Sequence, residues 1–226
     1  FSHTVAHDLK SPLTAIIGFA DLLCTRYDAL PAERIERLLE TITRTGYTMS
    51  NIIDELLLLA GVREAEVEPE PIEMGDIVAR ALERLAYAID DRQAEVIQPE
   101  MWPAAMGYGP WVKEVWVNYM SNAIKYGGRP PRIELGAEEL GGRGVRFWVA
   151  DNGDGLSAAD QAKIFAPFER LHQVRIQGHG LGLSIVRRIV EKLGGEVGVE
   201  SEGMPGAGST FFFILPAASE TPARTP

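Results

Sequence analysis

The helical pattern that decides the N-terminal part of the fold begins Phe1-Ser2-His3-Thr4-Val5-Ala6-His7-Asp8-Leu9-Lys10-Ser11-Pro12-Leu13. Apolar residues continue the pattern at steps of three and four as far as Cys24, which is typical of an amphipathic helix. Pro12 lies inside the helix, where its ring clashes with the carbonyl of Asp8 and donates no hydrogen bond to it. We therefore expect the helix to bend one turn after His7.

His7 and Asp8 are candidates for phosphoryl chemistry. A neutral imidazole, the ordinary state near pH 7, is nucleophilic at one ring nitrogen while the other nitrogen keeps its proton. The carboxylate of Asp8 can accept a hydrogen bond from that proton and stabilise the positive charge that develops on the ring during attack. A surface pair without a chemical role fits the same short pattern.

A second helical pattern follows the helix-breaking stretch 28–31 and runs from about Ala32 to Ala60. Its apolar residues alternate at steps of three and four and form a heptad seam: Ile35, Leu38, Ile42, Met49, Ile52, Leu56 and Leu59. Further apolar residues widen this seam beyond what two helices can bury, and each large aliphatic side chain left exposed forgoes about 1.5–3 kcal/mol. We expect a helical hairpin that forms a four-helix bundle in a homodimer, although a different partner helix would fit equally well.

A mixed pattern of helices and strands follows an acidic linker at residues 63–71. We expect helices near residues 77–89, 110–126 and 181–193, and strands near 94–98, 132–140, 144–151, 195–201 and 209–215. This mixture predicts an α+β fold in which helices cover one face of a sheet. The expected divisions are therefore 1–62, 63–71 and 72–216, followed by a disordered tail at 217–226, which is rich in Pro, Ala and Thr.

Composition limits the classes of partner and compartment. A formal net charge of −10 argues against a nucleic-acid partner, because phosphate backbones are bound by Lys and Arg. Cys24, which falls on the apolar stripe, is expected to be a small core residue. No apolar run is long enough to span a bilayer, so we expect this stretch to be cytoplasmic, whether the whole protein is membrane-anchored or soluble. The chain starts at Phe1 without Met, and we expect it to be a piece of a longer protein.

A polar helix face lies in the middle of the chain. Asn118, Asn122 and Lys125 are spaced at i, i+4 and i+7 and share one side of the expected helix, which Glu114 extends by a turn. Amide oxygens suit Mg²⁺, which prefers oxygen ligands, and an ammonium can neutralise phosphate charge. A solvated helix face is the plain alternative.

Two glycine-containing stretches follow. The first, Asp151-Asn152-Gly153-Asp154-Gly155, comes after an apolar strand; its first carboxylate can accept a hydrogen bond from an exocyclic amine such as that of adenine, although a plain turn also fits. The second, 178–183, opens a helix, and backbone amides at a helix N-terminus bind phosphate. The stretch 164–177 between them has the pattern of a lid, from which Arg170 is free to reach a phosphate.

Taken in this order, the motifs resemble the catalytic core of a sensor histidine kinase of two-component signalling. The resemblance covers most of the chain: 7–13 is similar to the phosphoacceptor box, 118–126 to the asparagine box, 151–155 to the first glycine box, 165–168 to the phenylalanine box and 178–182 to the second glycine box. It implies an ATP-binding domain with the Bergerat α/β sandwich. It also implies that His7 is phosphorylated from ATP and passes the phosphate to an aspartate of a response-regulator receiver domain. A sensor domain upstream of Phe1 is implied as well.

The resemblance also assigns the site residues. His7 would be the catalytic nucleophile with Asp8 orienting it, and Asn122 would hold Mg²⁺. ATP would be bound by Asn118, Asn122, Lys125, Tyr126, Asp151, Gly153, Gly155, Arg170, Gly178, Gly180, Leu181, Gly182 and Thr210.

Ser11 departs from the family pattern. Family members with dual activity commonly carry Thr or Asn there, to orient a water that dephosphorylates the partner; serine keeps the hydroxyl but lacks the methyl that limits its rotamers. Ser11 is therefore the phosphatase candidate. Two other functions stay open, namely a nucleotide-binding pseudokinase scaffold and an ATPase of the GHKL group that transfers nothing.

Overall fold

The computed structural model describes residues 2–166 and 181–218. The chain divides into two compact units, Phe1–Arg63 and Glu64–Pro226. Among the described residues, no helix is both long and apolar enough to cross a membrane.

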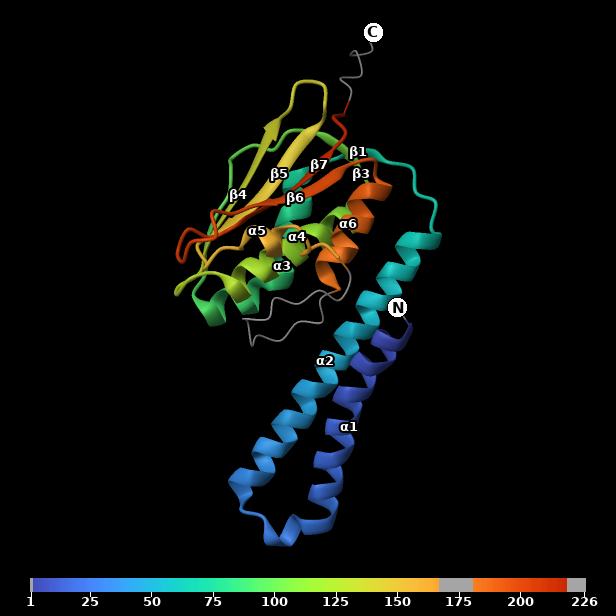
Figure 1. Cartoon of the computed structure of the whole chain (residues 1–226), viewed down its shortest axis with the longest axis vertical. Helices are drawn as coiled ribbons and strands as arrows, with labels where there is room; N and C mark the ends of the chain where they lie inside the picture. Colours follow the sequence, from blue (N-terminus) through green and yellow to red (C-terminus); the bar gives the residue numbers. More distant parts are fainter. Residues whose placement is uncertain (1, 167–180, 219–226) are drawn as a thin grey trace. The chain divides into compact units, whose positions relative to one another are not determined.

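The first unit is a hairpin of two long helices, α1 (Ser2–Arg26) and α2 (Ala32–Glu64), joined through a short 3-10 helix, η1 (Tyr27–Ala29), as Figure 1 shows. Helix α1 continues through Pro12 as one element. Pro31 stands just before α2, and its carbonyl accepts a hydrogen bond from the N–H of Arg34 at 2.8 Å, which begins the new helix. The expected hairpin is confirmed.

The hairpin leaves many apolar side chains exposed. Only four of its described hydrophobic residues are buried in the single chain: Leu23, Leu38, Ile52 and Val62. The exposed large ones are Leu13, Ile17, Tyr27, Leu39, Tyr47, Ile53 and Leu57. The expectation that Cys24 is a core residue is wrong for the single chain, since its side chain is exposed. Successive helix residues are turned by about 100° from one another, and Leu23 occupies the inward position.

The second unit contains a sheet whose described strands follow the order β2-β4-β5-β7-β6. These strands are β2 (Glu95–Ile97), β4 (Arg132–Glu139), β5 (Val145–Asp151), β6 (Glu196–Glu200) and β7 (Thr210–Leu215). Strand β2 is parallel to β4, and the other neighbours are antiparallel. The helices α3 (Met74–Arg92), α4 (Gly109–Tyr126) and α6 (Gly182–Lys192) lie on the same side of the sheet (Figure 1). The predicted α+β fold is confirmed.

Three short elements were not expected from the sequence. Strands β1 (Glu70–Ile72) and β3 (Ala105–Gly107) pair antiparallel apart from the main sheet, and α5 (Ala158–Gln161) follows the first glycine stretch. Strand β1 occupies the end of the expected linker, so the chain becomes regular before residue 72.

The core lies between α4 and the sheet. Trp116 and Tyr119 on α4 meet Phe147 of β5 and Phe213 of β7, all of them fully buried. The Phe147 and Phe213 rings stack with centroids 5.3 Å apart, and Trp116 stands edge-on to Phe213 at 5.4 Å. Because alternate residues of β5 and β7 point into this core, a one-residue slip of either strand would expose its aromatic rings. This packing fixes which face of α4 is turned away from the sheet.

Candidate functional site

The polar face of α4 brings two amides together. Asn122 Nδ2 donates a hydrogen bond to Asn118 Oδ1 at 3.3 Å, and both side chains are half-buried. Lys125 and Tyr126 are exposed at the end of the same helix, where Tyr126 is 39 % accessible. The predicted members of this face therefore lie along one helix, from a half-buried amide pair to exposed residues at the helix end.

Helix α6 begins against this amide pair. A Cβ atom added to Gly182, the first residue of α6, would lie 2.1 Å from Asn118 Nδ2. Leu181 immediately before it is buried, and its carbonyl accepts a hydrogen bond from the Ser184 hydroxyl at 2.7 Å. A side chain at position 182 would therefore displace the Asn118 amide.

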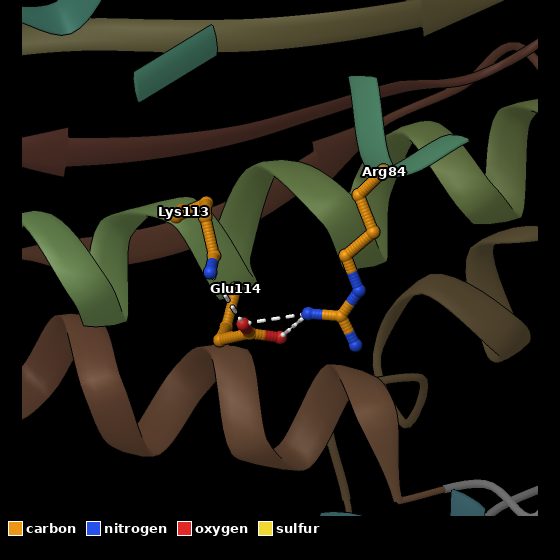
Figure 2. Close-up of polar contacts among 3 residues, drawn as sticks. All are labelled: Arg84, Lys113 and Glu114. Carbon is orange, nitrogen blue, oxygen red and sulfur yellow. Dashed lines mark hydrogen bonds and ion pairs between the residues drawn. The ribbon is translucent and has the colours of Figure 1, made fainter. Parts of the chain in front are cut away.

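Glu114, one turn earlier on α4, has a different role from the rest of the polar face. Figure 2 shows its carboxylate accepting two hydrogen bonds from Arg84 Nη1 of α3, at 2.7 and 2.9 Å, with Lys113 Nζ 3.5 Å away. Two cations therefore already balance this carboxylate. Glu114 lies one turn along the expected face, where its contacts tie α4 to α3.

Asp151 ends strand β5 and turns back on its own chain. Its N–H donates to the carbonyl of Ser209 at 3.0 Å, and its Oδ1 accepts from the N–H of Gly153 at 2.8 Å. Burial raises the pKa of Asp151 above its ordinary value, and backbone hydrogen bonds at Gly153 and Ser209 offset part of that rise. A half-buried carboxylate held in one orientation is a ready acceptor for an amine donor.

The first glycine stretch packs tightly against α4 and against the loop before β7. A Cβ atom at Gly153 would lie 2.3 Å from the carbonyl oxygen of Tyr126, the last residue of α4. The carbonyl of Gly153 accepts hydrogen bonds from the N–H groups of Gly206 and Gly208 at 3.0 and 2.9 Å. Gly155 follows in the same turn with φ +75°. The two glycine stretches thus both contact α4, one near Asn118 and the other at the helix end.

The remaining predicted residues are placed as follows. Thr210 is the first residue of β7 and pairs with Ala150 and Glu200, directly beside the end of β5. His7 and Asp8 lie within α1, and Ser11 is exposed on the same helix. The other three predicted ATP contacts, Arg170, Gly178 and Gly180, lie outside the described residues.

In the described part of the chain, the candidate metal ligands are side-chain amide oxygens. No group of three or more His, Cys, Asp or Glu side chains gathers there to hold a metal. An amide oxygen next to a triphosphate still suits Mg²⁺, which commonly takes one or two protein ligands and completes its shell with phosphate oxygens and water.

Sequence reasoning missed two polar side chains that organise this region. Asn152 makes three hydrogen bonds to backbone groups 20 to 24 residues away, and the Ser201 hydroxyl accepts from the N–H of Leu156 and donates to the carbonyl of Gly208. The Asn-Gly pair at 152–153 signalled only a turn. Nothing in the local sequence distinguishes Ser201 from an ordinary residue at the end of a strand.

Comparison with protein families accounts for most of the chain. The family described as "His Kinase A (phospho-acceptor) domain" matches residues 1–64. The family described as "Histidine kinase-, DNA gyrase B-, and HSP90-like ATPase" matches residues 107–219.

Individual proteins are similar over nearly the whole chain. The methanogenesis regulatory histidine kinase FilI of Methanothrix harundinacea (strain 6Ac) is 36 % identical over 218 residues, which cover 96 % of this chain and 24 % of FilI. The crystal structure of full-length ShkA in complex with AMPPNP is 27 % identical, with a TM-score of 0.65, over 96 % of this chain and 46 % of that one.

The structure of ThkA in complex with the response regulator TrrA is 21 % identical, with a TM-score of 0.69, over 97 % of this chain and 62 % of that one, and this likeness shows the fold alone. The chain spans roughly a quarter of the length of the curated relatives it matches first, between 22 % and 29 %.

Proposed function

The chain belongs to the sensor histidine kinases, as a phosphoacceptor domain followed by an ATP-binding domain, and we propose that it phosphorylates its own His7 from ATP and passes the phosphate to a response-regulator aspartate. The observation that carries the proposal is the joint match of both domains in one chain, in the order that places a histidine acceptor before an ATP site. Neither domain alone would imply phosphoryl transfer.

In the proposed ATP site, α4 is the common wall. Asp151 accepts a hydrogen bond from the exocyclic amine of adenine, for which its orientation by the N–H of Gly153 is suited. Asn122 holds Mg²⁺ through its amide oxygen, and Lys125 neutralises phosphate charge. Bound Mg²⁺ would supply charge neutralisation across the triphosphate. The backbone at Gly182, which lies against Asn118, is the proposed contact to the phosphates.

The fuller set of proposed ATP contacts also includes Asn118, Tyr126, Gly153, Gly155, Arg170, Gly178, Gly180, Leu181 and Thr210. Of these, Arg170, Gly178 and Gly180 lie outside the described residues. We propose residues 1–62 as the dimerisation and phosphotransfer hairpin, 63–71 as a linker, 72–216 as the ATP-binding domain and 217–226 as a tail.

The hairpin is proposed to form a homodimer. Its exposed apolar residues include Ile53 and Leu57, four residues apart on α2 and 41 % and 65 % accessible in the single chain. A second hairpin packed on this face would complete a four-helix bundle. The charged residues that intervene along α2 suit the outer surface of such a bundle.

The proposed transfer is an in-line displacement. A ring nitrogen of His7 attacks the γ-phosphorus, a nitrogen–phosphorus bond forms, the bond to the β,γ-bridging oxygen breaks, and ADP leaves. Asp8 accepts the hydrogen bond from the other ring N–H and stabilises the imidazolium. Most of the acceleration comes from positioning and charge stabilisation. In the reverse direction of signalling, the Ser11 hydroxyl is the candidate for orienting a water on the phosphorylated partner.

Incubation with γ-labelled ATP tests this proposal. Acid-labile, alkali-stable label on the protein is expected, because a phosphoramidate behaves in that way. Bound ATP without any label would identify a pseudokinase scaffold. Steady ATP turnover without phosphoprotein would identify an ATPase of the GHKL group.

Nucleotide binding tests the proposed site by itself. For Asn122→Asp we expect Mg²⁺-dependent ATP affinity to fall by about tenfold, since an amide ligand next to the triphosphate becomes a charge that repels it. Binding measured by calorimetry with and without Mg²⁺ checks this. An unchanged affinity would remove Asn122 from the site.

A further inference from the structure

The side chain of Asn152 joins two distant parts of the ATP-binding unit. Its Oδ1 accepts hydrogen bonds from the N–H of Gly128 at 2.8 Å and from the N–H of Arg132 at 2.9 Å. Its Nδ2 donates to the carbonyl of Pro130 at 3.2 Å. One amide therefore holds the loop 127–132 at three points, 20 to 24 residues earlier in the chain.

This loop directly follows the end of α4. The N–H of Gly127 donates to the Ala123 carbonyl at 2.9 Å and closes the helix, and the next residue is held by Asn152. A Cβ atom at Gly128 would lie 2.7 Å from Asn152 Nδ2, and one at Gly153 would lie 2.3 Å from the Tyr126 carbonyl oxygen. Residues 126–128 and 152–153 therefore form a close backbone seam, with the Asn152 amide filling it.

The seam sets the position of Asp151 relative to α4. Asp151 immediately precedes Asn152, and the last helix residues on the other side of the seam are Lys125 and Tyr126. We propose that Asn152 is a positioning residue that holds Asp151 in register with the end of α4, so that base recognition and phosphate binding occur on one nucleotide at once. This inference rests on the proposed function, because it assumes that Asp151 accepts the amine of adenine.

The side-chain chemistry at position 152 follows from its three bonds. An amide offers both an acceptor for two N–H donors and a donor for one carbonyl, which matches the loop. Alanine loses all three bonds and leaves the loop's backbone groups to water. Aspartate keeps an acceptor for the N–H groups of Gly128 and Arg132, but its second oxygen replaces the donor and faces the Pro130 carbonyl without a hydrogen bond.

The test compares ATP with purine riboside 5′-triphosphate, which carries hydrogen in place of the 6-amino group. We expect the wild-type chain to prefer ATP by about tenfold or more, as for one hydrogen bond to a charged acceptor. In Asn152→Ala this preference should fall to about twofold, through loss of ATP affinity, while affinity for the analogue changes by less than about threefold. Asn152→Asp should keep most of the preference.

A matched control separates positioning from general destabilisation. Tyr119→Phe removes one part-buried hydrogen bond, from the hydroxyl to the Phe212 carbonyl at 3.1 Å, without contact to the seam. It should lower the melting temperature and leave the ATP preference unchanged.

The outcomes distinguish the positioning role of Asn152 from adenine recognition by Asp151. A preference that survives in Asn152→Ala, or that falls as far in Tyr119→Phe, would overturn the positioning role while the proposed function stands. A wild-type chain that binds both nucleotides equally would contradict adenine recognition by Asp151 and with it the premise of this inference.

Discussion

The hairpin and the ATP-binding unit treat their apolar residues in opposite ways. The ATP-binding unit buries a cluster of aromatic residues against one another, with Trp116, Phe147 and Phe213 fully enclosed. The hairpin has residues of similar hydrophobicity, such as Ile17 and Leu57, more than half exposed. One unit closes its own core, and the other presents an apolar face.

This difference corresponds to the two proposed tasks. A nucleotide site needs side chains held to within fractions of an ångström, which a closed core and a fixed seam provide. An acceptor histidine needs to meet an ATP site and then a different protein, and a helical surface is suited to both. The ATP-binding unit thus encloses its own core, whereas the proposed homodimer would cover the apolar face of the hairpin with a second chain.

Leu57→Glu is expected to give the largest effect. If the apolar face of the hairpin is a dimer interface, the change removes two leucine side chains from it, at about 1.5–3 kcal/mol each, and adds two charges. The dimer should weaken by about 100-fold or more, measured as the molar mass in solution across a dilution series. Nucleotide affinity should not change.

Tyr87→Glu is the matched control for this substitution. Tyr87 is 84 % exposed on α3 of the other unit, so its replacement should leave association unchanged. A Leu57→Glu chain that remains dimeric at the same concentrations would contradict the assignment of the exposed face.

Phe213→Ala tests the closed core of the ATP-binding unit. Removing this fully buried ring should lower the free energy of unfolding of the ATP-binding unit by about 3–5 kcal/mol, because a cavity opens against Phe147 and Trp116. Denaturant unfolding followed by tryptophan fluorescence measures it. Association through the hairpin should persist, and loss of the dimer would show that the two units are not independent.

Two glycine substitutions, one in each unit, compare the packing of the ATP-binding unit with that of the hairpin, and their expected effects are smaller. Gly182→Ala should cost about 1–3 kcal/mol of stability and weaken ATP binding, because the new methyl group meets the Asn118 amide. Gly18→Ala on α1, where a Cβ atom meets nothing within 4 Å, should stabilise the hairpin by about 0.5–1 kcal/mol. Thermal unfolding and calorimetry check both, and equal effects at the two sites would contradict the contrast.

The smallest effect is expected for Asp151→Asn. Burial raises the pKa of Asp151, so the folded state binds this proton more tightly than the unfolded state does. The cost of burying the charge is therefore present above the folded pKa and is relieved as the pH falls through it. The amide should make the unit slightly more stable at pH 7 and abolish this part of the pH dependence, while weakening ATP binding.

Denaturant unfolding at pH 7 and pH 5 measures the change. A variant less stable than the wild type at pH 7 would show that the carboxylate is stabilised by its backbone hydrogen bonds more than burial costs it.

Long periodic elements were predictable from sequence, and most short or distant ones were not. The α4 helix and strands β5 and β7 carry clear periodicity, and the structure has them within a residue or two of the expected bounds. The three-residue strand β2 was also expected, whereas β1 and β3, equally short, were not, because they are defined by pairing with each other.

Prediction of the site from the sequence was limited in the same way, by contacts between residues that are distant in the chain. The amide pair on α4 follows from helical spacing alone. The ties of Glu114 to Arg84 and of Asn152 to the loop 127–132 depend on tertiary contacts between residues 20 to 30 positions apart, which no local pattern contains. Exposure of Cys24 depends on which stripe of α1 faces α2 and which is left for a second chain.

Phosphate incorporation by the His7→Gln chain tests the central claim most directly. We predict that this variant binds ATP with wild-type affinity, since the ATP site belongs to the other unit, yet takes up no acid-labile label from γ-labelled ATP. If it becomes labelled to the same extent as the wild type, the acceptor is a different residue and the proposed division of labour between the two units is wrong.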